Sequence, residues 1–507
     1  MQQPVKISNA LISVFYKDGL EPLAKALHQL GVNIYSTGGT QEFIENLNIP
    51  VHAVENLTGY PSILGGRVKT LHPKVFGGIL ARRSNTQDQQ EVKEFDIPFF
   101  DLVVVDLYPF EETVRSTQEE SKIIEKIDIG GVSLIRAAAK NFTDTVIICD
   151  KNNFSIFAET LLQQQGETFI DQRRAYATKA FHVTSDYDGK IYQYFNTETA
   201  TAFKASVSPA KVLRYGENPH QKGIFYGDIN ELLSQKHGKE LSYNNLLDID
   251  AALNLINDFT EPTVAILKHN NPCGVASRGS ILQAWTDALA GDPVSAFGGV
   301  IVANKPIDEA TANEIDKIFM EVLIAPSYEG NALSILQSKK NRVLLQLNSK
   351  MPTRKQFRSL LNGVIEQDKN EVILTKDNLM LVTKTAANQT SLDDMLFADR
   401  IVKHAKSNTI VIVKNAQLLG IGCGQTSRVD ALKQAISKAQ GFEFDLTGAV
   451  MSSDAFFPFP DCVEIAENAG IKNVIQPGGS IKDEASINYC NQHGIAMYFT
   501  GIRHFKH

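Results

Sequence analysis

The strongest constraint on the fold is a likeness between two distant stretches of the chain. One reads VAILKHNNPCGVASRGSILQAW (264–285), and the other reads IVIVKNAQLLGIGCGQTSRVDALKQA (410–435), with four extra residues. Each has an apolar strand, a Lys, an Asn close behind, a glycine-containing turn, Ser-Arg, and a helix with Leu four residues after the Arg. Two such units fused in one chain would place His269 and Asn415 on comparable strand ends. Chance similarity of two strand–turn–helix units is the alternative.

The N-terminal part of the chain predicts a domain of another kind. Short apolar runs at 10–15, 32–37, 101–108 and 145–150 have the length of buried strands, and helical patterns lie between some of them. Strands that alternate with helices in this way are typical of a parallel sheet. A long helical stretch at 171–195 carries aromatic residues at near-helical spacing, which indicates core packing rather than a ligand site.

A polar segment at 196–212 is the best candidate for a domain link. It is rich in Thr, Ala, Ser and Lys and poor in large apolar residues, as domain boundaries often are. We therefore expect an N-terminal domain of residues 1–198 and a C-terminal region of residues 199–507. If the internal likeness is a duplication, that region divides into subdomains at about 199–365 and 366–507.

Composition narrows the class of protein. The 507 residues exceed what one core accommodates, and 43% hydrophobic and 21% charged residues are ordinary for a globular protein. A formal net charge of −7 argues against nucleic-acid and membrane partners. The start lacks a signal-peptide pattern. The five cysteines are scattered without a C-x-x-C pair, which predicts a reduced, cytoplasmic chain without a zinc knuckle.

Two glycine-rich segments of the N-terminal domain suit a phosphate ester. In YSTGGTQEF (35–43) the glycines let backbone N–H groups approach an anion at a helix N-terminus, between two threonine hydroxyls. In GGRVKTLHPKVFGG (65–78) the alternation of Arg67 and Lys69 would point both cations to one side. The alternatives are an ordinary helix cap and a solvated surface loop.

A third segment, EKIDIGGVSLIRAAAKN (125–141), adds a carboxylate. Asp128 precedes a glycine pair that opens an apolar helix, and Lys140 follows three turns later. Asp128 could also be only an N-terminal helix cap. Three ion-bearing, glycine-rich segments in one small domain favour a phosphate-ester pocket.

The C-terminal region concentrates polar groups after apolar runs. A strand that ends in Lys268 and His269 resembles the way open α/β sheets deliver catalytic groups, here before an expected Pro-Cys-Gly turn. A zinc deaminase would need Pro-Cys-x-x-Cys with an upstream His-x-Glu, but Ala276 stands at the second Cys position. Zinc deamination is therefore disfavoured.

Several motifs together resemble one family, the bifunctional purine-biosynthesis proteins that join an aminoimidazolecarboxamide ribonucleotide (AICAR) formyltransferase to an IMP cyclohydrolase. The likeness covers nearly the whole chain. It implies an α/β protein whose methylglyoxal-synthase-like parallel-sheet domain is followed by a duplicated cytidine-deaminase-like region without zinc. The motifs are LRYGENPHQ (213–221), KHNNPCG (268–274), KNAQLLGIGCGQTSR (414–428), SDAFFPF (453–459) and RHFKH (503–507).

The resemblance implies a formyl transfer from the co-substrate 10-formyltetrahydrofolate to the 5-amino group of AICAR. By this likeness Lys268 and His269 are the catalytic pair, assisted by the amide of Asn415. His269 would accept the amine proton, and Lys268 would stabilise the developing charge or protonate the leaving nitrogen. Substrate binding is assigned to Arg214, Tyr215, His220, Arg503, Phe297 and, as an acid near the folate ring, Glu321.

The same resemblance implies that the N-terminal domain closes formyl-AICAR (FAICAR) to IMP with loss of water. Lys69 and Tyr108 would polarise the formyl oxygen, while Asp128 and Lys140 would manage protons at the carboxamide. The expected substrate contacts are Ser13, Lys17, Thr37, Gly39, Thr40, Arg67 and Thr70.

The family likeness further implies a homodimer with the formyltransferase sites at the subunit interface, and it leaves a monovalent-cation requirement open. One departure bears on function: Asp106 stands where the family usually has Asn, and a carboxylate cannot donate the amide's hydrogen bond. Pro460 likewise replaces a frequent Arg. The alternative reading is a formyltransferase only, whose N-terminal domain is a nucleotide-binding regulatory module.

Overall fold

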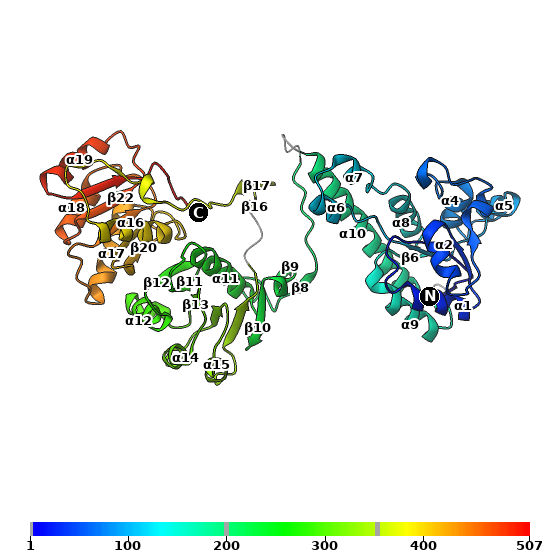
Figure 1. Ribbon diagram of the computed structural model, residues 1–507, viewed down its shortest axis with the longest axis horizontal. Helices are drawn as coiled ribbons and strands as arrows, with labels where there is room; N and C mark the ends of the chain where they lie inside the picture. The colour runs from blue at the N-terminus through cyan, green and yellow to red at the C-terminus, as the bar shows by residue number, and fades with distance from the viewer. Residues whose placement is uncertain (1–3, 197–201, 350–354) are drawn as a thin grey trace. The chain divides into compact units, whose positions relative to one another are not determined.

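The computed structural model describes residues 4–196, 202–349 and 355–507. The chain divides into two compact units, Met1–Ser206 and Val207–His507 (Figure 1). The predicted boundary between residues 198 and 199 lies outside the described residues. Within them, no helix has the length and apolarity that a membrane crossing requires.

The N-terminal unit is built on a five-stranded sheet whose paired neighbours all run parallel, in the order β4-β3-β2-β5-β6. This confirms the parallel sheet and the four strands predicted from the apolar runs. The strands are β2 (Asn9–Ser13), β3 (Asn33–Ser36), β4 (His52–Ala53), β5 (Leu102–Val105) and β6 (Val146–Ile148).

Helices cover both faces of this sheet. Strand β5 is apolar at every position because both of its faces are buried: Leu102 and Val104 lie in one core cluster, Val103 and Val105 in the other. The first cluster lies under α1 and α9, and the second under α4, α8 and α10. These helices are α1 (Leu20–Gln29), α4 (Pro73–Leu80), α8 (Gly130–Lys140), α9 (Phe154–Gln163) and α10 (Ile170–Phe195).

Shorter elements complete the unit, and two of them form a small antiparallel pair, β1 with β7. They are β1 (Val5–Lys6), α2 (Gly38–Glu45), α3 (Val54–Thr58), α5 (Thr86–Glu94), α6 (Phe110–Ser116), α7 (Glu120–Ile124) and β7 (Glu167–Thr168).

The C-terminal unit contains one twelve-stranded sheet, in the order β10-β15-β14-β13-β11-β12-β20-β19-β21-β22-β23-β18. The order is the same from either end, so the sheet has a pseudo-two-fold axis between β12 and β20, which confirms the internal repeat. The strands of the first half are β10 (Leu233–His237), β11 (Thr263–Lys268), β12 (Asn271–Ser277), β13 (Val300–Ala303), β14 (Val322–Ala325) and β15 (Val343–Leu347). Those of the second half are β18 (Met380–Leu381), β19 (Ile410–Lys414), β20 (Gln417–Gly422), β21 (Val450–Ser453), β22 (Asn473–Gln476) and β23 (Ala496–Phe499).

The first long helix of each repeat packs on one face of the sheet, and the later helices of the repeat pack on the opposite face. The first face packs against α11 (Tyr243–Ile256) and α16 (Gln389–Val402) in one continuous core. The opposite face has a separate core in each repeat. Its helices are α12 (Ile281–Gly291), α13 (Pro293–Ala296), α14 (Glu309–Ile315) and α15 (Ala332–Leu336) in the first repeat, and α17 (Arg428–Gly441), α18 (Asp461–Asn468) and α19 (Asp483–Gln492) in the second.

The predicted Pro-Cys-Gly turn is wrong, because Pro272, Cys273 and Gly274 lie inside strand β12. The chain reverses two residues earlier, at His269 and Asn270, in a two-residue hairpin turn. Gly274 serves close packing instead: a Cβ there would lie 2.0 Å from the backbone oxygen of Ala288 in α12. Glycine therefore marks the contact between strand and helix rather than a turn.

Two small hairpins complete the unit and pair with no other described strand. One joins β8 (Ala210–Val212) to β9 (Ile224–Tyr226), and the other joins β16 (Lys355–Leu360) to β17 (Gly363–Asp368). Every residue of β16 and β17 is exposed, including apolar Ile365, and Leu361 between them is 99% exposed.

Candidate functional site

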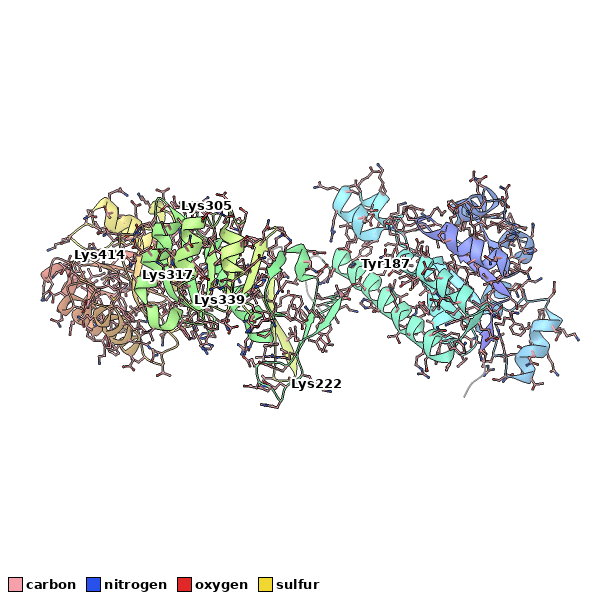
Figure 2. The ribbon with its side chains drawn as sticks, turned by 90° about the horizontal axis from the view of Figure 1, so that it is seen from below. Tyr187, Lys222, Lys305, Lys317, Lys339 and Lys414 are labelled. Atoms are coloured by element: carbon pink, nitrogen blue, oxygen red, sulfur yellow. The ribbon has the colours of Figure 1, made fainter. Side chains whose placement is uncertain are left out.

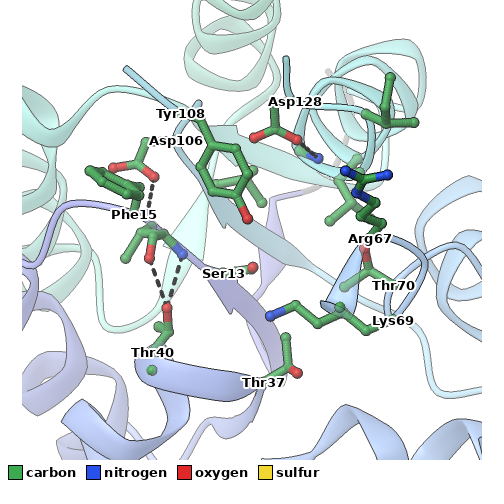
Figure 3. A pocket seen from close by; sticks show the side chains of 18 of the residues that line it. Ser13, Phe15, Thr37, Thr40, Arg67, Lys69, Thr70, Asp106, Tyr108 and Asp128 are labelled. Atoms are coloured by element: carbon green, nitrogen blue, oxygen red, sulfur yellow. Dashed lines mark hydrogen bonds between the residues drawn. The ribbon is translucent and has the colours of Figure 1, made fainter. Parts of the chain in front are cut away.

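The N-terminal unit contains a cavity of about 490 Å³ at the carboxyl ends of β2, β3 and β5. This is where open α/β sheets bind ligands. All but one of the residues predicted for this domain line the cavity, and Figure 3 shows the side chains of Ser13, Lys69 and Tyr108 among those around it. They are Ser13, Lys17, Thr37, Gly39, Thr40, Arg67, Lys69, Thr70, Tyr108 and Asp128.

The exception is Lys140, the exposed last residue of α8. The cavity is lined by Gly130 and Gly131 at the opposite end of this helix, about 15 Å away along its axis at 1.5 Å per residue. The expectation that Lys140 acts in this pocket is therefore not met within a single chain.

The glycine pair after Thr37 forms the start of α2, and Gly39 lines one wall of the cavity. The ammonium group of Lys69 lies beside Gly38, where a Cβ would be 3.0 Å from its Nζ. The threonine hydroxyls are already engaged. Thr37 donates to Glu55 at 2.7 Å. Thr40 donates to the Val14 carbonyl at 2.9 Å, as Figure 3 shows. Cationic and backbone N–H groups remain to bind an anion here.

Arg67 and Lys69 do not lie on a strand, so the expected alternation is wrong, but a turn brings both to the cavity. The guanidinium of Arg67 is paired with the carboxylate of Glu125, which accepts hydrogen bonds from both Nε and Nη2 of the arginine. This hydrogen-bonded pairing raises the pKa of Arg67. A bound phosphate would compete with Glu125 for the same guanidinium.

Asp128 stands at the opposite wall, before α8. Its Oδ1 accepts a hydrogen bond of 2.6 Å from Gly131 N, and its own backbone N–H donates to the Tyr187 hydroxyl at 2.9 Å. Tyr187 lies on α10 (Figure 2) and belongs to a buried cluster, as predicted for the aromatic stripe. Burial raises the pKa of the Asp128 carboxyl. The carboxylate thus caps the helix and also faces the cavity.

Aromatic side chains form a third wall, of which only Tyr108 was predicted. The rings of Phe15 and Tyr108 meet edge to face at 5.7 Å, and Lys126 Nζ lies over both at 5.3 and 5.6 Å. Burial, followed by the nearby charge of Asp128, raises the pKa of Tyr108, so its phenol keeps a proton to donate. A lone Phe in an apolar run carries no sequence signal that separates it from the core.

Asp106 is buried at the cavity edge and accepts hydrogen bonds only. One oxygen accepts from Phe15 N, and the other accepts from Tyr16 N at 3.0 Å. Burial raises the pKa of its carboxyl, while these bonds and Lys17 oppose the shift. A carboxylate suits this position, because its two oxygens accept from the two backbone N–H groups that face it. The missing amide donor therefore leaves no described partner unsatisfied at this position.

In the C-terminal unit, Lys268 and His269 lie at the β11–β12 turn. His269 and Asn270 have left-handed φ values of 52° and 64°, and Asp248 on α11 accepts from Asn270 N at 2.7 Å. Lys268 Nζ donates to the Phe297 carbonyl at 2.8 Å. The imidazole of His269 is exposed. The turn is thus fixed through its backbone while the ring stays accessible.

Aromatic and acidic groups lie at the same sheet edge as Lys268. The exposed ring of Phe297 packs against Phe319 with centroids 5.2 Å apart. Glu321 follows two residues later and pairs with Lys239 at 2.5 Å. Phe319 was not predicted, although its position two residues before Glu321 could have indicated it. These groups offer a stacking surface beside a cation.

The remaining predicted contacts lie at the surface, where Arg214, His220 and Arg503 are exposed and Tyr215 is half-buried. Arg214 stacks on the neighbouring Tyr215 ring and donates to its hydroxyl at 2.8 Å, while His220 lies in the same loop. Arg503 is exposed, but the tail that follows it is held: His504 is buried, and its N–H donates to the Asp454 carbonyl at 2.9 Å. The basic terminus is therefore ordered rather than frayed.

Asn415 occupies the equivalent turn of the second repeat, between β19 and β20. Asn415 and Ala416 have φ values of 53° and 50°, and their backbone N–H groups donate to Asp394 on α16 at 2.8 and 2.6 Å. Asp248 and Asp394 are both the sixth residue of their helices, α11 and α16. The two turns are thus built alike, as the repeat predicts.

The two turns nevertheless lie at opposite edges of the sheet. Strands β12 and β20 are antiparallel neighbours, with Ala276 opposite Gln417. The His269 turn precedes β12, whereas the Asn415 turn adjoins the other end of that strand. A strand of seven residues separates them by roughly 20 Å. A single chain therefore does not bring Asn415 to Lys268 and His269.

Within residues 4–196, 202–349 and 355–507, no group of three or more His, Cys, Asp or Glu side chains is arranged to hold a metal ion.

Comparisons with known proteins cover the chain from end to end. The family model described as AICARFT/IMPCHase bienzyme matches residues 138–438, and the MGS-like domain model matches residues 19–133. A bifunctional purine biosynthesis protein PurH of Bacteroides thetaiotaomicron is 58% identical, covering 100% of both chains. Proteins of the same name from Aquifex aeolicus and Acetivibrio thermocellus are 47% and 46% identical, covering 98% and 99% of this chain and 100% of theirs. The match to the MGS-like model confirms the predicted N-terminal fold, whereas the deaminase likeness of the repeats stays a prediction.

Proposed function

This chain belongs to the AICARFT/IMPCHase bienzyme family, and from that membership we propose which of its residues perform each reaction. It is an AICAR formyltransferase and IMP cyclohydrolase that carries out the last two steps of IMP synthesis. The observation that carries this conclusion is the end-to-end match to bifunctional relatives. The alternative, a regulatory N-terminal module without cyclohydrolase activity, gains no support from them.

Ring closure is assigned to the N-terminal cavity. The carboxamide nitrogen of FAICAR must attack the formyl carbon, so a folded substrate conformation supplies much of the rate by proximity. Lys69 and the protonated phenol of Tyr108 polarise the formyl oxygen, and the Asp128 carboxylate accepts a proton from the carboxamide. The formyl oxygen leaves as water. The cationic wall near Gly38 and Arg67 suits the ribose phosphate.

Formyl transfer is assigned to Lys268, His269 and Asn415. The 5-amino group of AICAR is a poor nucleophile because its lone pair is delocalised into the ring. His269 accepts its proton as the nitrogen attacks the formyl carbon, Asn415 donates to the developing oxyanion, and Lys268 stabilises charge near the departing N10 of the folate. The ring pair Phe297–Phe319 offers the pteridine a surface, and Arg214, Tyr215, His220, Glu321 and Arg503 complete the substrate contacts.

We propose that the formyltransferase site is shared between two copies of this chain. The separation of the His269 and Asn415 turns supports a homodimer in which each site takes Lys268 and His269 from one copy and Asn415 from the other. The exposed hairpin β16–β17 is a further support, since an isolated two-stranded hairpin is marginally stable in water. Leu361 and Ile365 offer apolar surface to a second copy.

The cellular setting is part of the same proposal. All five cysteines are free thiols, as expected in the reducing cytoplasm. The expected ligands are AICAR, FAICAR and 10-formyltetrahydrofolate. A monovalent-cation requirement stays a prediction.

The first experiment combines the protein with AICAR and 10-formyltetrahydrofolate and follows tetrahydrofolate, FAICAR and IMP. We expect tetrahydrofolate and IMP to rise together, with IMP forming faster than FAICAR cyclises without protein. FAICAR accumulating without enzymatic IMP would contradict the assignment of the cavity. Absence of tetrahydrofolate would contradict the roles of Lys268 and His269.

A further inference from the structure

We propose that Arg278 is a positioning residue for formyl transfer, because it holds the backbone turn from which Asn415 projects. Arg278 directly follows β12 of the first repeat, whereas Asn415 belongs to the second. Its Nη1 donates to the carbonyls of Asn415 at 2.7 Å, Ala416 at 3.2 Å and Ser277 at 2.7 Å. The inference rests on the proposed role of Asn415 in formyl transfer.

The guanidinium of Arg278 is held in place by further hydrogen bonds through its Nε and Nη2. Its Nε donates to Asp287 at 2.5 Å, and its Nη2 donates to the Gln417 side-chain oxygen at 3.2 Å. Gln417 in turn donates to the Asp287 carbonyl at 2.8 Å. A planar group with several directed donors is rigid once these partners are in place. Arg278 therefore presents a fixed surface to the turn.

The turn needs support from outside because both of its residues are left-handed without being glycine. Backbone in this region is disfavoured for residues with a Cβ. Asp394 accepts from the two N–H groups, and Arg278 donates to the two carbonyls. The Asn415 side chain is exposed and makes no hydrogen bond to any described residue. The backbone is thus clamped on both sides, while the amide is left for a ligand.

The contact is not a general feature of the repeat. Arg428 is the counterpart of Arg278, but it is buried against Asp454 and donates to Asn408 at 2.8 Å. It makes no hydrogen bond to the His269 turn, whose carbonyl at His269 accepts instead from the Asn271 side chain at 2.9 Å. The two copies have therefore diverged, and only the Asn415 turn is held by an arginine of the other repeat.

A double-mutant cycle tests whether Arg278 acts through Asn415. We expect Arg278→Gln to lower kcat for formyl transfer on the order of 10- to 100-fold with little change in the KM for AICAR. In an Asn415→Ala background the same substitution should lower kcat no further. Arg278→Lys, which keeps the charge but loses the planar fork, should fall between. Cyclisation of supplied FAICAR is the internal control and should be unchanged.

Arg342→Gln is the matched control. Arg342 is also largely buried in the C-terminal unit, where it donates to Asp316 at 2.7 Å and to the Leu336 carbonyl at 3.0 Å. This variant should lower the Tm without lowering kcat. Equal losses of kcat in the Arg278 and Arg342 variants, or independent losses from Arg278→Gln and Asn415→Ala, would overturn the proposal.

Mixed dimers locate the effect. In a mixture of His269→Ala and Asn415→Ala chains, the intact site uses the Asn415 of the His269→Ala chain. Arg278→Gln added to that chain should abolish most of the restored activity, whereas the same substitution on the Asn415→Ala chain should not. Equal loss from both placements would refute a positioning role.

The outcomes separate this inference from the function on which it rests. No tetrahydrofolate from the wild-type protein would refute the proposed function. Normal wild-type activity, a loss with Asn415→Ala and an unchanged kcat with Arg278→Gln would refute the role of Arg278 alone.

Discussion

The two active regions of this molecule differ in how completely one chain builds them. In the N-terminal unit, the ends of parallel strands converge on one cavity, and ten predicted residues line it together. In the C-terminal unit, the proposed catalytic groups lie in two turns at opposite edges of an antiparallel centre. In a parallel sheet the loops after the strands lie at one edge, whereas the two-fold duplication places its two equivalent turns at opposite edges.

The separation is a consequence of the symmetry itself. The pseudo-two-fold axis between β12 and β20 relates the start of one strand to the start of its antiparallel neighbour. Equivalent turns must therefore lie at opposite ends of the central pair. His269 and Asn415 occupy equivalent positions, so their distance of roughly one strand length is built into the repeat. Only another copy of the chain can place one beside the other.

Single substitutions of catalytic residues should have the largest effects, and each should lower the rate of only one of the two reactions. His269→Ala is expected to lower kcat for formyl transfer on the order of 10²- to 10⁴-fold, because general-base catalysis is lost. Cyclisation of supplied FAICAR should continue at the wild-type rate. Lys69→Met should do the reverse, lowering cyclisation by about 10²-fold through loss of charge stabilisation at the formyl oxygen. Steady-state kinetics with each substrate measures both.

Subunit mixing should distinguish the regions next. After exchange between His269→Ala and Asn415→Ala chains, we expect roughly a quarter of wild-type formyl transfer, since half of the dimers are mixed and each has one intact site. A mixture of Lys69→Met and Asp128→Asn chains should regain no cyclisation, because both residues line one cavity of one chain. Regained cyclisation in the second mixture, or no regained formyl transfer in the first, would contradict the assignment of a one-chain site to the N-terminal unit and a shared site to the C-terminal unit.

A smaller effect concerns the pH dependence of the N-terminal reaction. Burial raises the pKa of Asp128, so cyclisation should decline with acid at a pH above the ordinary carboxyl range near 4. The raised pKa means that the folded state binds the proton more tightly than the unfolded state. Stability is therefore lost as pH rises through this window. Asp128→Asn should remove this pH-dependent loss of stability, so its Tm should exceed that of the wild type at pH 7 but not at pH 3. The same variant should lose most of its cyclisation activity.

The cavity was largely predictable because three short glycine-rich segments carry charged or hydroxyl side chains and the family likeness supplied the other residues. Thr37, Lys69 and Asp128 each stand in such a segment, and a parallel sheet brings these segments to one edge. Phe15 and Lys126 were not predicted, because an aromatic residue after a strand and a lysine after a helix are common in any fold and do not by themselves indicate a site. Lys140 was misplaced because three helical turns carry it away from the glycine pair.

The repeat was predictable from sequence, but its geometry was not. The spacing after Lys268 and Lys414 showed that the two turns correspond, yet a sequence does not state whether neighbouring strands run parallel or antiparallel. The register of Ala276 against Gln417 decides that point. Similarly, Pro272 and Gly274 have the composition of a turn, while the close approach of α12 explains the glycine within a strand.

Asp106→Asn should have the smallest effect, and it tests how far the cavity depends on a carboxylate. Both carboxylate oxygens accept backbone N–H groups, from Phe15 and from Tyr16. An amide accepts with one oxygen only, so one of these bonds is lost, at a cost of about 1 kcal/mol. The substitution also relieves the desolvation that raises the pKa of Asp106, and this gain opposes the loss.

Because the two contributions oppose each other, we expect the Tm of the Asp106→Asn protein to stay close to wild type at pH 7 and cyclisation to change by less than about threefold. Asp106→Ala is the matched comparison: it removes both acceptors, leaves the N–H groups of Phe15 and Tyr16 without this partner and should lower cyclisation further. Thermal unfolding and cyclisation rates of the two variants provide the measurement. A large loss with Asn would mean that the negative charge of Asp106 acts on Lys17 or on the ligand. A loss with Ala no greater than with Asn would mean that the backbone of Phe15 and Tyr16 does not position the aromatic wall.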